Sequence, residues 1–159
     1  MTKLHAPRAR FAVKAILGLL LAIVVTGAAT AASSAATGAS APRRGALHLT
    51  KECSEYTGLA DSYCTITSSN VKAIKVGSRV VYLQAAGATS LDSDIVLVVG
   101  PGNYALGHVM LDFATGTGEV RIWGGRGHFT CFHAKAVVSA LGGADWAWDG
   151  KYRFGPHGH

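Results

Sequence analysis

The chain has 159 residues, of which 49% are hydrophobic and 15% are charged, and this composition excludes a wholly disordered polypeptide. Its formal net charge of +6 would suggest a protein that binds nucleic acid or a membrane surface. However, four of the fifteen cations lie in residues 1–14, which contain no acid. The remaining eleven cations face nine acids and form no basic stripe in the sequence, so we expect no nucleic-acid partner.

The N-terminus has the three parts of a secretory signal. Residues 1–14 are basic, Ala15–Val25 are apolar and uncharged, and the small residues that follow contain an Ala-x-Ala sequence ending at Ala31. The apolar run is shorter than the roughly 20 residues that a membrane-spanning helix needs. We therefore expect residues 1–31 to be a cleaved signal peptide and the mature protein to be secreted, without stable membrane insertion. An uncleaved anchor that extends to Ala32 is the alternative.

The segments that flank the predicted folded domain are short. Residues 32–45 are rich in Ser, Ala and Gly and are predicted to be a flexible linker, residues 46–155 the folded domain, and residues 156–159 a C-terminal tail. The His-Gly-His sequence of the tail could bind a metal adventitiously, but a mobile tail is the favoured interpretation. The sequence has no zinc-ligand spacing, phosphate-binding loop or nucleophile elbow, so we expect neither a metal nor a cofactor.

Export makes the cysteines informative, because disulfides form and persist in oxidising compartments. Cys53 and Cys64 lie eleven positions apart in a polar stretch, and we expect them to form a disulfide that closes a small loop. Two free thiols or a metal site are the alternatives, but no second cysteine pair lies nearby to complete a metal site. Cys131 is then unpaired, and it is predicted to be a buried small hydrophobic residue rather than a reactive thiol.

The rest of the domain is predicted to form strands, because short runs of β-branched and aromatic residues are separated by glycine-rich turns. In Gly100–Asn103, a Pro and then a Gly stand where a type II turn requires them. Seven or eight strands at such spacings predict an all-β barrel or sandwich. The predicted strands are Cys64–Ser68, Arg79–Ala85, Asp94–Val99, Tyr104–Leu111, Glu119–Trp123, His128–Val138 and Trp146–Phe154, with Val71–Val76 as a candidate eighth.

The last predicted strand alternates most regularly. Trp146, Trp148, Tyr152 and Phe154 share one face, which we expect to be buried, and mostly charged residues share the other. The Asp-Gly pair that ends at Gly150 is also a hairpin signal, but a hairpin would leave very short arms. We therefore expect one continuous strand with a bulge or a close contact at the glycine.

Two segments carry a resemblance to a known family. Gly124–Ala134 (GGRGHFTCFHA) resembles the Gly-Gly-x-Gly-x-Phe element of the allene oxide cyclase and dirigent families. Trp146–Phe154 (WAWDGKYRF) resembles the closing strand of small secreted actinobacterial proteins with an allene oxide cyclase barrel-like domain. The similarity covers Leu47–Phe154. It implies an eight-stranded antiparallel β-barrel, which agrees with the strand count.

The resemblance also implies roles for the matched residues. Gly124, Gly125 and Gly127 fit a tight turn, and Phe129 fits a buried anchor. In plant members of these families, the barrel guides stereoselective cyclisation or coupling of small apolar molecules. No local motif around the active-site residues of the plant enzymes matches this chain, so the resemblance assigns no catalytic residue.

Five polar side chains are candidates for ligand binding, because an eight-stranded barrel is just wide enough for one small ligand that a few polar groups would orient. Glu119 and Arg121 would form an inward ion pair that polarises a carbonyl, or an outward pair on a solvated face, which is favoured. His133 shares the parity of Cys131 and would be an inward general base or a hydrogen-bonded core histidine. The five candidates are Tyr82, His108, Glu119, Arg121 and His133.

Two functions follow from these observations. The first is a secreted barrel that binds a small hydrophobic molecule or serves as a non-catalytic module, with oligomerisation left open. The alternative is an isomerase or cyclase whose barrel confines a reactive substrate near its transition geometry. The lack of a convincing acid–base pair favours the first. A third hypothesis is a surface-interaction protein that acts through exposed aromatic residues.

Overall fold

The computed structural model describes residues 43–155, and the expected signal peptide, its cleavage site and the C-terminal tail lie outside these residues. The described chain contains eight strands and one short 3-10 helix, η1. The elements are β1 (Arg44–Glu52), β2 (Tyr63–Ser69), β3 (Arg79–Tyr82), β4 (Ser90–Gly100), β5 (Asn103–Asp112), β6 (Thr117–Arg126), η1 (Gly127–Phe129), β7 (Phe132–Gly142) and β8 (Asp145–Phe154).

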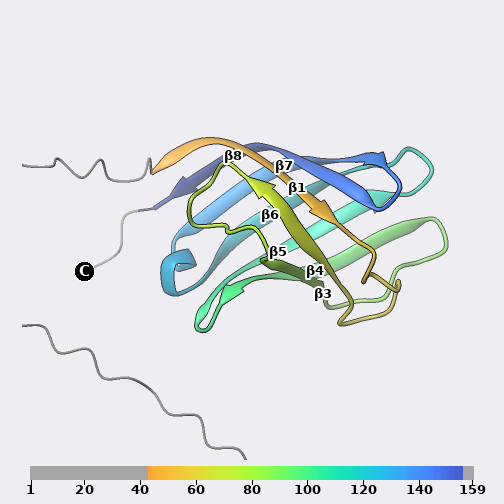
Figure 1. The fold of residues 1–159 in the computed structure, drawn as a ribbon, viewed down its shortest axis with the longest axis horizontal. Helices are drawn as coiled ribbons and strands as arrows, with labels where there is room; N and C mark the ends of the chain where they lie inside the picture. The colour runs from red at the N-terminus through yellow and green to blue at the C-terminus, as the bar shows by residue number, and fades with distance from the viewer. Residues whose placement is uncertain (1–42, 156–159) are drawn as a thin grey trace, which may run out of the picture. The chain divides into compact units, whose positions relative to one another are not determined.

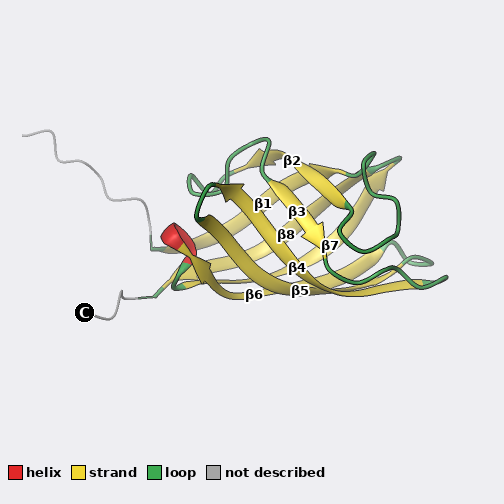
Figure 2. Cartoon of the chain, turned by 90° about the horizontal axis from the view of Figure 1, so that it is seen from below, coloured by secondary structure: helices red, strands yellow, loops and turns green. Residues whose placement is uncertain are grey.

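The eight strands form a closed antiparallel barrel (Figures 1 and 2). Each strand pairs with its neighbours in the sequence, and β8 closes the barrel by pairing with β1 along the whole of β1. Closure satisfies the backbone groups that would otherwise lie along exposed sheet edges. The predicted eight-stranded all-β barrel is therefore confirmed, and the sandwich alternative is wrong.

β1 is not among the strands predicted from the sequence. Leu47, Leu49 and Lys51 point into the barrel, and the residues between them face outward or are less buried. A lysine at an inward position interrupts the alternation of apolar and polar residues by which a strand is recognised. Because β1 begins at Arg44, the last two residues of the expected linker belong to the barrel.

Two predicted strands differ from the structure. Residues 71–76 form turns, in which Val71 and Ile74 are buried and the Ile74 N–H donates to the Val71 carbonyl. The predicted strand His128–Val138 starts as η1, and β7 begins only at Phe132, because Gly127 turns the chain with a φ of 63°. Cys131 consequently lies in a turn, where it is unpaired and half-buried rather than buried.

The aromatic inward face predicted for the last strand is confirmed, although burial is complete only in its middle. Trp148 and Tyr152 are buried inside the barrel, the aromatic residues at the two ends of this face are half-buried, and the charged residues between them face outward. A Cβ added to Gly150 would lie 2.1 Å from the Lys135 carbonyl oxygen, so the expected close contact is present. The turn between β4 and β5 has Gly102 at a φ of 69°, as its type II signature requires.

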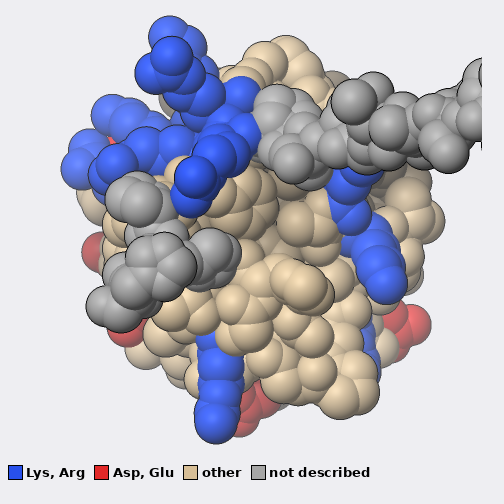
Figure 3. Space-filling view, turned by 90° about the vertical axis from the view of Figure 1, so that its left-hand side faces the viewer, with Lys and Arg blue, Asp and Glu red and all other residues tan. Residues whose placement is uncertain are grey.

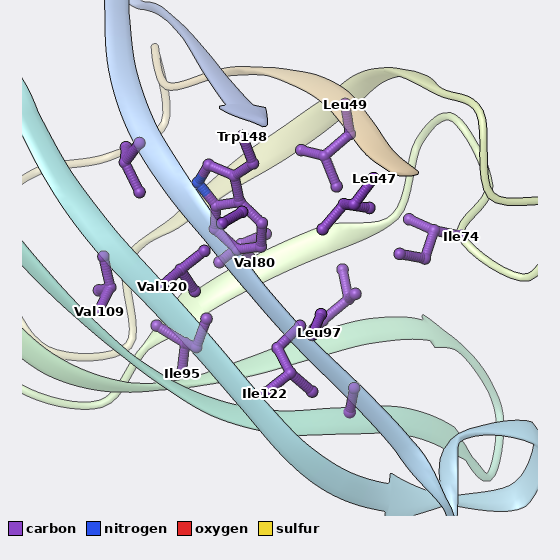
Figure 4. Packing of buried hydrophobic residues seen from close by; sticks show 14 of the residues in the cluster. Leu47, Leu49, Ile74, Val80, Ile95, Leu97, Val109, Val120, Ile122 and Trp148 are labelled. Carbon is purple, nitrogen blue, oxygen red and sulfur yellow. The ribbon is translucent and has the colours of Figure 1, made fainter. Parts of the chain in front are cut away.

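Side chains fill the interior of the barrel with one continuous hydrophobic cluster. Ile66, Leu97, Phe132 and Trp148 come from four different strands, and each has no exposed surface. Figure 4 shows the indole of Trp148 pointing into this cluster. Burial of these large side chains drives the closure of the barrel, because each contributes about 1.5–3 kcal/mol when it leaves water.

Candidate functional site

The most unusual group in the barrel interior is the amine of Lys51. It is only 3% exposed, and its Nζ lies 2.6 Å from the Tyr82 hydroxyl. The same Nζ lies 3.5 Å from both sulfurs of the Cys53–Cys64 disulfide, which is present as expected. It also lies within 6 Å of the ring centroids of Tyr82, Trp146 and Trp148, close enough for cation–π attraction.

Burial changes the acid–base properties of this cluster. Removal from water lowers the pKa of Lys51 to about 7 from its usual 10.5. Burial, together with the neighbouring Tyr56, raises the pKa of Tyr82 well above its usual value. Near neutral pH, the Lys51 amine is therefore neutral in about half of the molecules, and it lies beside the protonated hydroxyl of Tyr82. Sequence reasoning missed the lysine because β1 itself was not recognised as a strand.

Of the five candidate ligand-binding residues, only Tyr82 lies inside the barrel. His133 faces outward, since Phe132 is the first inward residue of β7 and the parity expected from Cys131 is lost at the turn before it. The inward orientation expected for His133 is therefore wrong. The turn at η1 is the physical reason, because it breaks the strand that the sequence pattern predicted to be continuous.

The other three candidates also face outward. Glu119 forms ion pairs with Arg121 and, at 2.8 Å, with Lys135, so the favoured outward orientation of the Glu119–Arg121 pair is correct. His108 on β5 lies 3.0 Å from the carboxylates of both Asp92 and Asp94 on β4. The structure thus brings none of His108, Glu119, Arg121 and His133 together with Tyr82.

The charges of the barrel are divided between its two ends. We call the end where β1 begins the basic end, because eight cations and none of the nine acids lie there. Figure 3 faces this end and shows Lys and Arg gathered most densely at one corner, with Asp and Glu only at the margins. The eight cations are Arg43, Arg44, Lys72, Lys75, Arg79, Arg126, Lys151 and Arg153.

The opposite end, which we call the acidic end, holds all nine acids. Of the three remaining cations, Lys51 is buried at this end, and Arg121 and Lys135 lie near the middle of their strands. The cations form no basic stripe along the sequence, but the fold gathers most of them at one end of the barrel. Antiparallel strands bring cations that are far apart in the chain to one end, as Arg44 and Arg153 show.

A groove of about 630 Å³ crosses the outer surface of β1, β8 and β7 beside the basic end. Long cationic side chains stand along it, and small residues form its floor. No acid lines it. Among the described residues, Arg44, Lys151 and Arg153 have no ion-pair partner. The groove is lined by Arg44, Gly45, Ala46, His133, Ala134, Lys135, Gly150, Lys151, Tyr152 and Arg153.

The cations of this groove are direct cross-strand neighbours. Arg153 on β8 is opposite Arg44 on β1 and opposite His133 on β7. Lys151 is likewise opposite Lys135. Like charges directly opposite one another destabilise a sheet, and an anion bound between them would reverse the sign of that interaction.

No family model, curated protein or solved structure matches this chain. Within residues 43–155, no group of three or more His, Cys, Asp or Glu side chains could hold a metal ion. That part of the chain also contains no helix long and apolar enough to cross a membrane.

Proposed function

We propose that the protein is a non-catalytic module that binds a linear polyanion, with closely spaced phosphate groups, in the groove of β1, β8 and β7. The observation that carries this proposal is the lining of the groove, which contains five basic side chains and no acid; of the five, Lys135 is paired with Glu119 outside the groove. Phosphate oxygens accept charge-assisted hydrogen bonds from Arg and Lys, and these are stronger than hydrogen bonds between neutral groups.

The shape of the groove supports a polymer rather than a membrane as the partner. The small residues Gly45, Ala46, Ala134 and Gly150 line the groove between the cations. A membrane surface would call for large apolar side chains that enter the lipid. The aromatic side chain that lines the groove, Tyr152, is only 8% exposed and packs within the barrel.

The same lining argues against single-stranded nucleic acid. Single-stranded nucleic acids are bound by aromatic side chains on which bases stack, in addition to cations. The groove offers the cations without an exposed aromatic platform. We therefore infer a polyanion that contains no nucleobases. Preferential binding of duplex or single-stranded DNA is one of the outcomes that the test distinguishes.

Three expectations from the sequence stay predictions. They are a small apolar ligand in the barrel, a cyclase or isomerase activity, and a relationship to the allene oxide cyclase and dirigent families. Side chains such as Trp148 and Phe132 fill the interior, so any ligand that enters the barrel would require part of the core to move. Secretion also stays a proposal. The Cys53–Cys64 disulfide supports it, because such bonds persist in oxidising compartments.

The test is titration of the oxidised protein with long-chain inorganic polyphosphate at several salt concentrations. We expect Arg44→Ser combined with Arg153→Ser to weaken binding by about tenfold or more and to lower the salt slope by about two. The matched control is Lys72→Ser combined with Lys75→Ser, which removes the same charge from the same end outside the groove. The control should lose much less affinity.

Each other outcome counts against the proposal. Equal losses in the two double variants would show a response to net charge rather than a groove. Absence of polyphosphate binding at low salt would overturn the proposal outright. Tighter binding to vesicles that contain anionic lipid, or to DNA, than to polyphosphate at matched phosphate concentration would replace the partner proposed.

A further inference from the structure

The environment of Lys51 differs from that of the exposed lysines among residues 43–155. It is the third inward residue of β1, after Leu47 and Leu49, and it lies one residue before the strand ends at the acidic end. A lysine at this place cannot reach water without movement of its cover, since its side chain is 3% exposed. The fold therefore places a primary amine in a chamber that apolar side chains fill.

The groups that face the amine come from every element packed around it. β2 contributes Cys64, β3 contributes Tyr82, and β8 contributes Trp146 and Trp148. Cys53, just beyond β1, completes the shell. None of these groups is a carboxylate, so the amine has no counter-charge that would hold it in its protonated form.

The loop between β1 and β2, residues 53–62, covers this chamber. Its Tyr56 ring packs edge-on against Tyr82 with centroids 4.9 Å apart. The Asp61 N–H donates to the Tyr82 carbonyl at 2.7 Å, and the Cys53–Cys64 disulfide ties the base of the loop. Opening of this loop would give a small molecule access to the amine.

We propose that Lys51 is a binding site for a small aldehyde or ketone with an apolar body, which it holds as a reversible imine. The Nζ lone pair would attack the carbonyl carbon to form a C–N bond while the carbonyl electrons move to oxygen. The Tyr82 hydroxyl, at 2.6 Å, is placed to pass a proton from nitrogen to oxygen. Loss of one water molecule then gives the C=N bond, so no oxidant or reductant is needed.

Two further observations support this assignment. Desolvation lowers the pKa of Lys51 to about 7, so about half of the amine is neutral at neutral pH. An exposed lysine has only about a thousandth as much neutral amine there. In addition, the Tyr56 hydroxyl and the Trp148 Nε1 are buried donors with no hydrogen-bond partner among the described residues. A ligand with a second oxygen atom, which imine formation does not remove, would supply an acceptor to either donor.

The experiment is reductive trapping of the intact, oxidised protein with benzaldehyde and cyanoborohydride at pH 7, followed by peptide mass mapping. Lys72, Lys75, Lys135 and Lys151 are exposed and serve as internal references. We expect Lys51 to be labelled several-fold faster than any of them. Reduction of the disulfide in folded protein should increase labelling of Lys51 further and leave the four references unchanged.

A variant tests whether the Tyr82 hydroxyl takes part in imine formation or whether labelling depends only on access to Lys51. Tyr82→Phe keeps the ring that packs on Tyr56 and removes only the hydroxyl. We expect it to slow labelling of Lys51 by at least about tenfold, without effect on the references. Circular dichroism of the same samples establishes that the barrel is folded.

Three results would overturn the proposal. The first is an unlabelled Lys51 in both oxidised and reduced protein while exposed lysines react. The second is labelling that appears only under conditions that unfold the barrel. The third is equal labelling in Tyr82→Phe and the unaltered chain, which would remove the proton-transfer step. Polyphosphate titration of the same preparation is independent of all three, so the two proposals can fail separately.

Discussion

The two ends of the barrel treat positive charge in opposite ways. At the basic end, Arg44, Lys151 and Arg153 stand on the surface without an acid partner among the described residues. At the acidic end, Lys51 is buried in the core, and Glu119 forms ion pairs with two cations from the middle of the barrel. The first arrangement leaves charge available to a partner, whereas the second confines or neutralises it.

This difference shows that net charge is a poor guide to what a small barrel can bind. Residues 43–155 contain eleven cations and nine acids, which by number alone suggests an almost neutral surface. Their separation gives the barrel two ends of opposite sign, and each end presents its own local field. The variants below act on one end at a time and so test whether the ends are independent.

The largest expected effect concerns Lys51 at the acidic end. Its folded pKa, about 7, lies below its unfolded value, so the unfolded chain binds more protons between these pH values and stability rises with pH. We expect the free energy of unfolding to increase by about 3 kcal/mol from pH 7 to about pH 9.5. Urea denaturation of the oxidised protein at several pH values measures this increase.

The matched variant for this prediction is Lys51→Met, which fills the same space with an apolar side chain. It should abolish most of the rise between pH 7 and about pH 9.5. Measurements stop below the range where Tyr82 matters, because its raised pKa makes stability fall again at higher pH. An unchanged slope in the variant would mean that some other group causes the pH dependence.

The next effect in size concerns the disulfide, which ties the loop over the acidic end. Replacing Cys53 and Cys64 together with Ser removes a closed loop of eleven residues from the unfolded chain. The loop-entropy model predicts a loss of about 3 kcal/mol in the free energy of unfolding. Non-reducing mass spectrometry should show the two cysteines linked and Cys131 free. A Cys131 linkage would contradict the assignment.

Neutralising the basic end should have a smaller effect of the opposite sign. Arg44→Ser combined with Arg153→Ser removes two like charges that are directly opposite across β1 and β8. We expect a gain of about 0.5 kcal/mol in the free energy of unfolding at low salt. The gain should vanish in concentrated salt. Destabilisation at low salt would mean that the arginines contribute more by packing than they lose by repulsion.

The fold was predictable from the sequence because strands in a barrel keep a strict alternation. Trp148, Tyr152 and the outward charges between them follow this alternation, and the aromatic face is buried as expected. The exception is β1, where a lysine takes an inward position. Its burial depends on contacts with Tyr82 and the disulfide, and no local pattern in the sequence records these contacts.

The candidate site was harder to predict because it depends on how neighbouring strands are aligned, and not on the spacing of residues within one strand. The outward charged residues of β8 were expected, but whether they form a groove of one sign depends on which residues of β1 and β7 lie beside them. The orientation of His133 depends on one turn at Gly127, which shifts every later residue of β7 to the other face. A slip of one residue in a strand reverses all its side chains, so an unrecognised turn is enough to misplace a candidate.

The smallest expected effect tests the boundary between the two ends. Glu119 lies next to the groove and holds Lys135 and Arg121 through ion pairs. Glu119→Gln should release both cations and tighten polyphosphate binding by about two- to threefold. The control is Asp145→Asn at the far side of the acidic end, which changes the net charge equally. Hydrogen bonds from Lys135 and Arg121 hold the pKa of Glu119 below its usual value, so the effect should persist at about pH 5. Equal tightening by Asp145→Asn would show that the whole charge of the barrel, and not its groove, attracts the polymer.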